Sequence, residues 1–253
     1  MARARRPAAE VPDTIAHPDW QGLLEAAMET EGGSLSHYNA LYRYSLGNLA
    51  FLMYQGVTPQ PVANYQRWTE VGRHVKRGTK AFYILRPITV KLHDQLDEDG
   101  QPKTIQRFKP IKSVFRLEDT EGDPLPEIEL PEWSRERALG ALGLRIVEFE
   151  AFEAGMQGYS RDKDIAINPI AKYPEKTFFH ETAHHVVGHV AGDHAEYVQH
   201  RGVFEAEAEG TSHLVMNELR LLTEDARLSS AAYLRHWMNG QSIPERSVRR
   251  IFK

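Results

Sequence analysis

The sequence predicts an α+β fold divided into two domains. The chain has 253 residues, which is long enough for two small domains that each have a core. Both halves contain segments whose apolar residues recur at three and four positions, as in helices, and short segments rich in aromatic and β-branched residues, as in strands. Between the halves, residues 118–132 hold seven acidic residues, three prolines and no Lys or Arg, a composition typical of a linker. We therefore expect a flexible tail over residues 1–18, a first domain over 19–120, a linker over 121–133 and a second domain over 134–253.

Helices are expected to come before strands in the first half. One helix begins at Trp20 and ends at Gly32 and Gly33, and a second begins at Ser34 or Ser36 and ends at Gly56. Next come a short helix over 66–74, a turn over 76–80, strands over 81–90, 105–108 and 113–117, and a hairpin loop over 94–100. In the second half we expect helices over 134–142, 177–190, 203–221 and 228–238, and strands over 144–149 and 164–168.

The composition excludes several classes of protein. With 31 Lys and Arg against 35 Asp and Glu the net charge is −4, so any contact with nucleic acid requires a local basic patch. The absence of cysteine excludes disulfides, thiol catalysis and Cys-ligated metal sites. No apolar run reaches the roughly 18 residues of a membrane-spanning helix, and the basic start lacks the apolar stretch of a secretory signal. We expect no membrane contact and a cytoplasmic location.

One segment carries a metal-binding motif. His180, Glu181 and His184 form the pattern H-E-x-x-H within an apolar segment that is predicted to be helical. Residues four apart lie on one face of a helix, so both imidazoles can reach one ion, and Glu181 can act as a general base beside it. Zinc accepts imidazole nitrogen and carboxylate oxygen, and a site with three protein ligands leaves a position for water. The alternative is a helix whose histidines are merely exposed and satisfied.

A third ligand is expected about 20 residues further along the chain. Glu205 and Glu209 are four residues apart and share a helix face, whereas Glu207 points away from it. We predict Glu205 as the ligand of one zinc ion and Glu209 as the partner of a ligand imidazole, with Glu209 and Glu207 as the alternative ligands. The opposite interpretation is that all three glutamates form a solvated face. The longer pattern H-E-x-x-H-x-x-G-x-x-H does not fit, because Gly188 and His189 each lie one position out of step. His213 is a weaker candidate for stabilising an oxyanion.

The first half contains a basic segment with interspersed aromatic residues. Residues 64–91 hold seven Lys or Arg, one acidic residue and four aromatic residues. Proteins that bind single-stranded nucleic acid need this mixture, because cations contact phosphates and aromatic faces stack on bases. The predicted contacts are Arg73, Lys76, Arg77 and Lys80 for phosphates and Tyr65 and Tyr83 for stacking. The alternative is that Trp68 and Phe82 belong to the core and that the cations only solvate a turn.

These motifs together resemble ArdC-type antirestriction proteins. The first half carries Arg43-Tyr44-Ser45-x-x-Asn48, then Trp68-x-x-x-Gly72-Arg73-x-Val75-Lys76-Arg77-Gly78-x-Lys80, and the phrase from Val114 to Gly122. In the same order these are similar to the N-terminal single-stranded-DNA-binding domain of that family. The second half resembles its compact zincin-like metallopeptidase domain and, more distantly, ImmA/IrrE-type regulators. The resemblance covers residues from about 20 to 222.

The resemblance implies a function and a set of site residues. The family's zinc-binding histidines correspond to His180 and His184, its catalytic glutamate to Glu181, and its downstream E-x-x-x-E to Glu205 and Glu209. It implies protection of incoming plasmid or phage DNA against host restriction through binding of single-stranded DNA, with a possible protein substrate for the peptidase site. Thr182 departs from the family's usual aliphatic residue. Two other functions remain open: a regulatory zinc protease that cuts one partner protein, and a DNA-binding protein with a non-catalytic zinc site.

Overall fold

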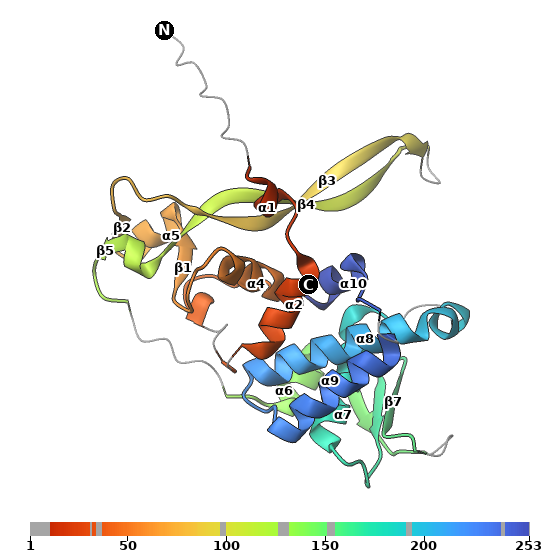
Figure 1. The fold of residues 1–253 in the computed structure, drawn as a ribbon. Coiled ribbons are helices and arrows are strands. Elements are labelled where there is room, and N and C mark those ends of the chain that lie inside the picture. The colour runs from red at the N-terminus through yellow and green to blue at the C-terminus, as the bar shows by residue number, and fades with distance from the viewer. Residues whose placement is uncertain are drawn as a thin grey trace.

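The chain has an α+β fold, which confirms the fold class predicted from the sequence. The computed structural model describes residues 11–30, 32–33, 37–96, 100–125, 132–150, 155–190, 194–238 and 241–252. Figure 1 shows a long two-stranded ribbon across the N-terminal half and a group of helices in the C-terminal half. None of the helices within these residues is long and apolar enough to cross a membrane.

The N-terminal half begins with helices that are followed by short strands. Its elements are α1 (Asp13–Ala16), α2 (Trp20–Glu29), α4 (Leu46–Tyr54), β1 (Val62–Asn64), α5 (Tyr65–Glu70), β2 (Arg73–Val75) and β5 (Thr120–Gly122). Helix α4 starts later than predicted because the hydroxyl of Ser45 accepts a hydrogen bond from the backbone N–H of Asn48 and caps the helix there. The predicted caps Ser34 and Ser36 lie outside the described residues.

The ribbon is formed by β3 (Phe82–Leu96) and β4 (Pro102–Arg116), which pair antiparallel. With β1 on the outer edge of β4 they make a sheet in the order β1-β4-β3. The sequence predicted strands over 105–108 and 113–117, whereas the structure has one continuous strand through both. Pro110 does not end the strand because it lies opposite Leu85, whose backbone N–H and carbonyl oxygen bond to the side chain of Asn48 and need no partner on β4.

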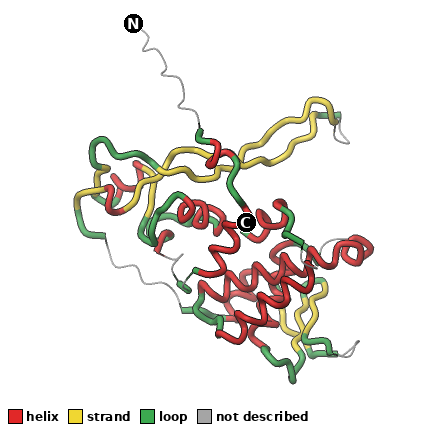
Figure 2. Tube along the Cα trace, viewed as in Figure 1, coloured by secondary structure: helices red, strands yellow, loops and turns green. Residues whose placement is uncertain are grey.

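The C-terminal half packs helices against a small sheet. It contains α6 (Arg135–Leu142), β6 (Arg145–Val147), β7 (Gly158–Arg161), β8 (Asp164–Ile167), α7 (Pro174–Val187), α8 (His194–Glu218), α9 (Glu224–Met238) and α10 (Glu245–Ile251). The sheet has the order β6-β8-β7. Figure 2 shows the helices of this half lying side by side. Helix α8 is kinked at His200, where the backbone leaves helical geometry.

One apolar core joins the two ends of the chain. Trp20 and Leu24 of α2 and Phe51 of α4 are buried in the same cluster as Val248 and Ile251 of α10. The backbone N–H of Gly47 also donates a hydrogen bond to the carbonyl oxygen of Phe252. Helix α10 therefore lies between the N-terminal half and α8, and the predicted division into two domains stays a prediction.

Parts of the predicted tail and linker belong to helices and strands. Residues 1–10 of the tail lie outside the described residues, whereas residues 13–16 form α1 and Ile15 is buried in the core. Residues 121 and 122 of the predicted linker belong to β5, which pairs with β2. Residues 126–131 of the linker lie outside the described part of the chain.

Candidate metal centre

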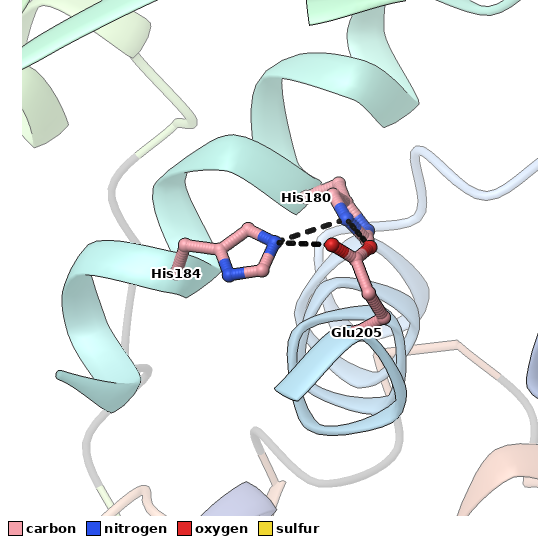
Figure 3. Close-up of side chains that lie close together, drawn as sticks. All are labelled: His180, His184 and Glu205. Atoms are coloured by element: carbon pink, nitrogen blue, oxygen red, sulfur yellow. Dashed lines mark hydrogen bonds and ion pairs between the residues drawn. The ribbon is translucent and has the colours of Figure 1, made fainter. Parts of the chain in front are cut away.

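Helix α7 places two histidines one turn apart. Pro174 occupies its first turn, where no backbone N–H is needed, and Glu175 adds a favourable negative charge there. The helix ends at Gly188, whose φ of 87° suits a residue without a side chain. Phe178 and Phe179 are buried in one apolar cluster with Met216 of α8, and His180 and His184 face Glu205 of the same helix (Figure 3).

Helix α8 brings a carboxylate to the two imidazoles (Figure 3). Nε2 of His180 lies 3.2 Å from Oε2 of Glu205 and 3.2 Å from Nε2 of His184. Nε2 of His184 lies 3.8 Å from Oε1 of Glu205. The three side chains therefore present two nitrogens and a carboxylate to one common point.

The spacing of these atoms fits a tetrahedral metal ion. Zinc–nitrogen bonds of about 2.0–2.1 Å in tetrahedral geometry put two ligand atoms about 3.3 Å apart. The two ring nitrogens lie 3.2 Å apart and Nε2 of His180 lies 3.2 Å from Oε2 of Glu205, both close to that value, and the other oxygen of the same carboxylate, Oε1, lies 3.8 Å from Nε2 of His184. Two imidazoles and one carboxylate are also a donor set that zinc accepts, although other divalent ions accept it too.

Glu209 holds the other ring nitrogen of His180. Oε2 of Glu209 lies 3.1 Å from Nδ1 of His180, and Oε1 lies 2.9 Å from Nζ of Lys176. Burial disfavours the carboxylate of Glu209, but its bonds to His180 and Lys176 outweigh burial and lower its pKa to about 2. Burial likewise disfavours the charged form of His180, yet its bonds to Glu205 and Glu209 raise its pKa to about 10. Without a metal ion, a protonated His180 thus bridges two carboxylates.

A second chain of buried groups holds His184. Its Nδ1 lies 2.9 Å from Nδ1 of His189, and Nε2 of His189 lies 2.8 Å from Oε2 of Glu207. Arg250 of α10 contacts the same oxygen at 3.0 Å. If His189 donates to Glu207 from Nε2, its Nδ1 accepts from His184, which leaves Nε2 of His184 with a lone pair for an ion. Burial, followed by the charge of His180, lowers the pKa of His184 to about 3, so this ring is neutral.

Glu181 is buried on the side of α7 that faces the small sheet. Burial raises the pKa of its carboxyl group, and His180 and a hydrogen bond with Ser160 of β7 partly oppose this effect. A methyl group on Gly158 would lie 2.6 Å from Cγ2 of Thr177 and 2.9 Å from the carbonyl oxygen of Ala166. Gly158 therefore allows β7 to pass close to α7 and brings Ser160 to Glu181.

The predicted glutamates do not form a solvated face. Glu205, Glu207 and Glu209 are all buried, at 6%, 2% and 1% exposure. Glu205 and Glu209 both contact His180, as their shared helix face predicted, whereas Glu207 points to His189. His213, the weaker candidate, is bonded through Nε2 to the carbonyl oxygen of Met28 on α2 and lies outside the His180–His184–Glu205 group.

Sequence reasoning missed His189. It lies one position out of step with the longer motif, so the sequence assigns it no role at the metal site. In the structure His189 lies beside His184 because the chain reverses at Gly188. The backbone N–H of His189 bonds to the carbonyl oxygen of His184 there. A glycine just after a helix that ends in histidines is the signal for this reversal.

The predicted DNA contacts lie mainly on one exposed turn. Lys76, Arg77 and Lys80 are exposed around Gly78, whose φ is 89°. Lys76 also bonds through Nζ to the carbonyl oxygen of Glu118 at 2.9 Å. Arg73 is directed inward and contacts Thr120, Gly122 and Asp123, so it fixes β2 against β5.

The aromatic residues of this segment divide into two groups. Trp68 is fully buried and donates from Nε1 to the carbonyl oxygen of Phe115, and Phe82 packs against the core, as the alternative interpretation held. Tyr65 is 59% exposed and suits stacking on a base. Tyr83 is partly buried against the core, with the Lys112 ammonium 5.6 Å from its ring centre.

A comparison with solved structures finds two crystal structures of one antirestriction protein. The chain is similar to the antirestriction protein ArdC of plasmid R388. The metal-free crystal structure of ArdC matches over 93% of both chains with 17% identity and a TM-score of 0.49. Its Mn(II)-bound structure matches over the same 93% with 17% identity and a TM-score of 0.44. No protein-family model matches the chain, and no curated protein matches it in sequence.

Proposed function

We propose that this chain is an ArdC-like antirestriction protein that binds single-stranded DNA and carries a zinc peptidase-type site. The observation that carries the second part is the convergence of His180, His184 and Glu205 upon one point. The first part rests on the sequence motifs shared with ArdC-type proteins and on the exposed basic turn.

His180, His184 and Glu205 would hold the ion, and the residues behind them fix how they do so. Glu209 orients His180 through Nδ1, and His189 with Glu207 orients His184 through its Nδ1. Such outer partners fix the tautomer and direction of a ligand imidazole. An ion bound there would supply Lewis-acid chemistry, polarising a peptide carbonyl and lowering the pKa of water.

Glu181 would move the proton. It follows His180 directly on α7 and is buried, and its raised pKa brings it nearer to neutral pH, where a general base works best. Its carboxylate can take a proton from the attacking water and return it to the leaving amine. Ser160 bonds to the same carboxyl group and limits its rotation.

The peptidase proposal is tested by separating metal binding from proton transfer. Wild type and Glu181→Gln are purified, their zinc and manganese contents are measured, and both are incubated with a library of unstructured fluorogenic peptides. We expect equal metal contents and a loss of cleavage in Glu181→Gln of at least about 100-fold. Metal in both proteins and cleavage by neither would reject the peptidase and leave a non-catalytic metal site.

The DNA-binding proposal is supported by charge and exposure. Lys76, Arg77 and Lys80 surround one turn, and Tyr65 offers an exposed aromatic face in the same segment. This combination suits a strand whose phosphates meet cations and whose bases stack. The test is fluorescence anisotropy of a labelled oligothymidine across a series of salt concentrations. An affinity that falls steeply with salt supports the proposal, and a flat response contradicts it.

A further inference from the structure

The outer part of the ribbon projects away from the body of the molecule (Figures 1 and 2). We call residues 86–96 of β3 and 102–112 of β4 the ribbon arm. The apolar core clusters include Leu85 and Val114 at the base of the ribbon. Among the described residues, no residue of the arm belongs to any of these clusters. The apolar core therefore does not hold the arm, which depends on the pairing of its own two strands and on the contacts of α1 with β4.

A two-stranded hairpin by itself is only marginally stable in water. One face of the arm carries aliphatic side chains, including Ile88, Val90, Leu92 and Ile105, that are covered only in part. Ordering such an arm costs free energy that packing against the core does not offset. A binding partner that covers the arm would offset this cost.

The arm is strongly basic in an acidic protein. It holds six cations and one acidic residue, Asp94, whereas the whole chain has a net charge of −4. The six are all exposed: Arg86, Lys91, Lys103, Arg107, Lys109 and Lys112. No ion pair of these six is found in the part of the chain that the structure describes.

The register places four of these cations, Arg86, Lys103, Arg107 and Lys109, on the same face as the aliphatic side chains. Arg86 lies directly opposite Lys109, Ile88 opposite Arg107, and Leu92 opposite Lys103. Like charges directly opposite each other destabilise a strand pair. The pair of Arg86 and Lys109 therefore opposes the hairpin unless an anionic partner lies over that face.

We propose that the ribbon arm binds double-stranded DNA by entering the major groove, with its cations on the phosphates. The major groove of B-DNA admits a two-stranded β-ribbon. From Arg86 to Leu92 the cationic face runs about 20 Å, which is roughly six base-pair steps. Neither strand places an aromatic side chain on this face between these residues, so it has no platform for stacking unpaired bases.

This site goes beyond the proposed function and is separate from it in space. The turn at Lys76, Arg77 and Lys80 follows β2, and Figure 1 shows β2 at the opposite end of the ribbon from the arm. The two surfaces can therefore be altered independently.

The test compares duplex with single strand in the full-length protein. The arm variant carries Arg86→Gln, Lys103→Gln, Arg107→Gln and Lys109→Gln, and the matched control carries Lys76→Gln, Arg77→Gln and Lys80→Gln. Anisotropy of a labelled duplex and of one of its strands is measured over a salt series. We expect the arm variant to lose at least about tenfold in duplex affinity, to lower the salt slope by up to about 3.6, and to keep single-strand affinity within about twofold. The control should keep its duplex affinity.

Several results would overturn the inference. These are a wild type that binds no duplex, an arm variant with unchanged duplex affinity, and an arm variant that loses duplex and single-strand binding equally. Sedimentation showing that only the arm variant loses self-association would make the arm an interface between copies of the chain. A wild type that binds duplex but not single strands would instead reject the proposed single-strand function and leave this inference standing. Because the arm lies outside the core, an unchanged melting temperature verifies that the variant is folded.

Discussion

The candidate metal centre and the basic surfaces of the N-terminal half differ in whether their charged side chains are buried or exposed. Between α7 and α8, Glu205, Glu207 and Glu209 are almost fully buried, and each contacts a histidine. On the 76–80 turn and the ribbon arm, the cations are exposed. Burying an unpaired charge costs free energy, so each buried glutamate needs a partner inside the protein. The atoms that it contacts are therefore fixed by the fold. Exposed cations are solvated by water and need no partner within the protein. Their role therefore depends on the molecule that binds to them.

The largest expected effect removes a ligand from the buried side of this comparison. His184→Ala should lower the metal content from about one ion per chain to nearly none, because only two ligands would remain. His185→Ala is the matched control, since it removes the next histidine of α7, which lies outside the ligand group. Elemental analysis of both variants beside wild type gives the answer. Equal loss of metal in both variants would contradict the assignment.

A smaller loss is expected from the groups behind the ligands. Glu207→Gln should weaken metal binding by about 10- to 100-fold, because His189 would lose the carboxylate that fixes its tautomer. His189→Ala should act in the same direction. The measurement is a competition titration with a chelator of known affinity. Unchanged affinity in both variants would show that the contact of His189 with His184 has no part in holding the ion.

The exposed cations of the 76–80 turn should each contribute a part of the single-strand affinity. Replacing Lys76, Arg77 and Lys80 together by Gln should reduce single-strand affinity and lower the salt slope by about 0.7 for each lost phosphate contact. Arg73→Gln should instead lower the melting temperature, because Arg73 bonds within the protein to Thr120 and the carbonyl oxygens of Gly122 and Asp123. A normal melting temperature with lost DNA affinity in Arg73→Gln would reverse this assignment.

The smallest effect concerns stability in acid. A hydrogen bond from Arg116 keeps the pKa of Asp119 below its usual value, although burial opposes this. The contact therefore stabilises the fold above the unfolded-state pKa near 4 and loses its effect as pH falls through the lower folded-state pKa. Asp119→Asn should cost about 1–3 kcal/mol at neutral pH and flatten the dependence of stability on pH below about 4. Urea unfolding at several pH values measures both.

The sequence predicted the approach of His180, His184 and Glu205 to one another better than it predicted the residues behind them. His180 and His184 followed from helical spacing, and Glu205 and Glu209 from a shared face four residues apart. Local periodicity decides these relations, so they could be derived without the fold. Arg250 could not be, because it meets Glu207 only where α10 packs on α8, 43 residues further along the chain. The continuous ribbon was also missed, since register across a hairpin depends on pairing rather than on the composition of each strand.

The sequence predicted the basic segment but not which of its side chains reach solvent. The 76–80 turn was expected and lies at the surface, but Arg73 within the same basic segment turns inward. Trp68 and Tyr65 are three residues apart on α5, yet one is fully buried and the other is 59% exposed. Composition identified the basic segment, whereas tertiary packing decided which of its members reach solvent.

The central claim is that His180, His184 and Glu205 hold one divalent ion. A crystal of the zinc-loaded protein, measured at the zinc absorption edge, tests it most directly. The account predicts a single anomalous peak about 2.0–2.2 Å from Nε2 of both histidines and from a carboxylate oxygen of Glu205. A peak ligated by other residues, or none at this point in a protein that contains zinc, would contradict it.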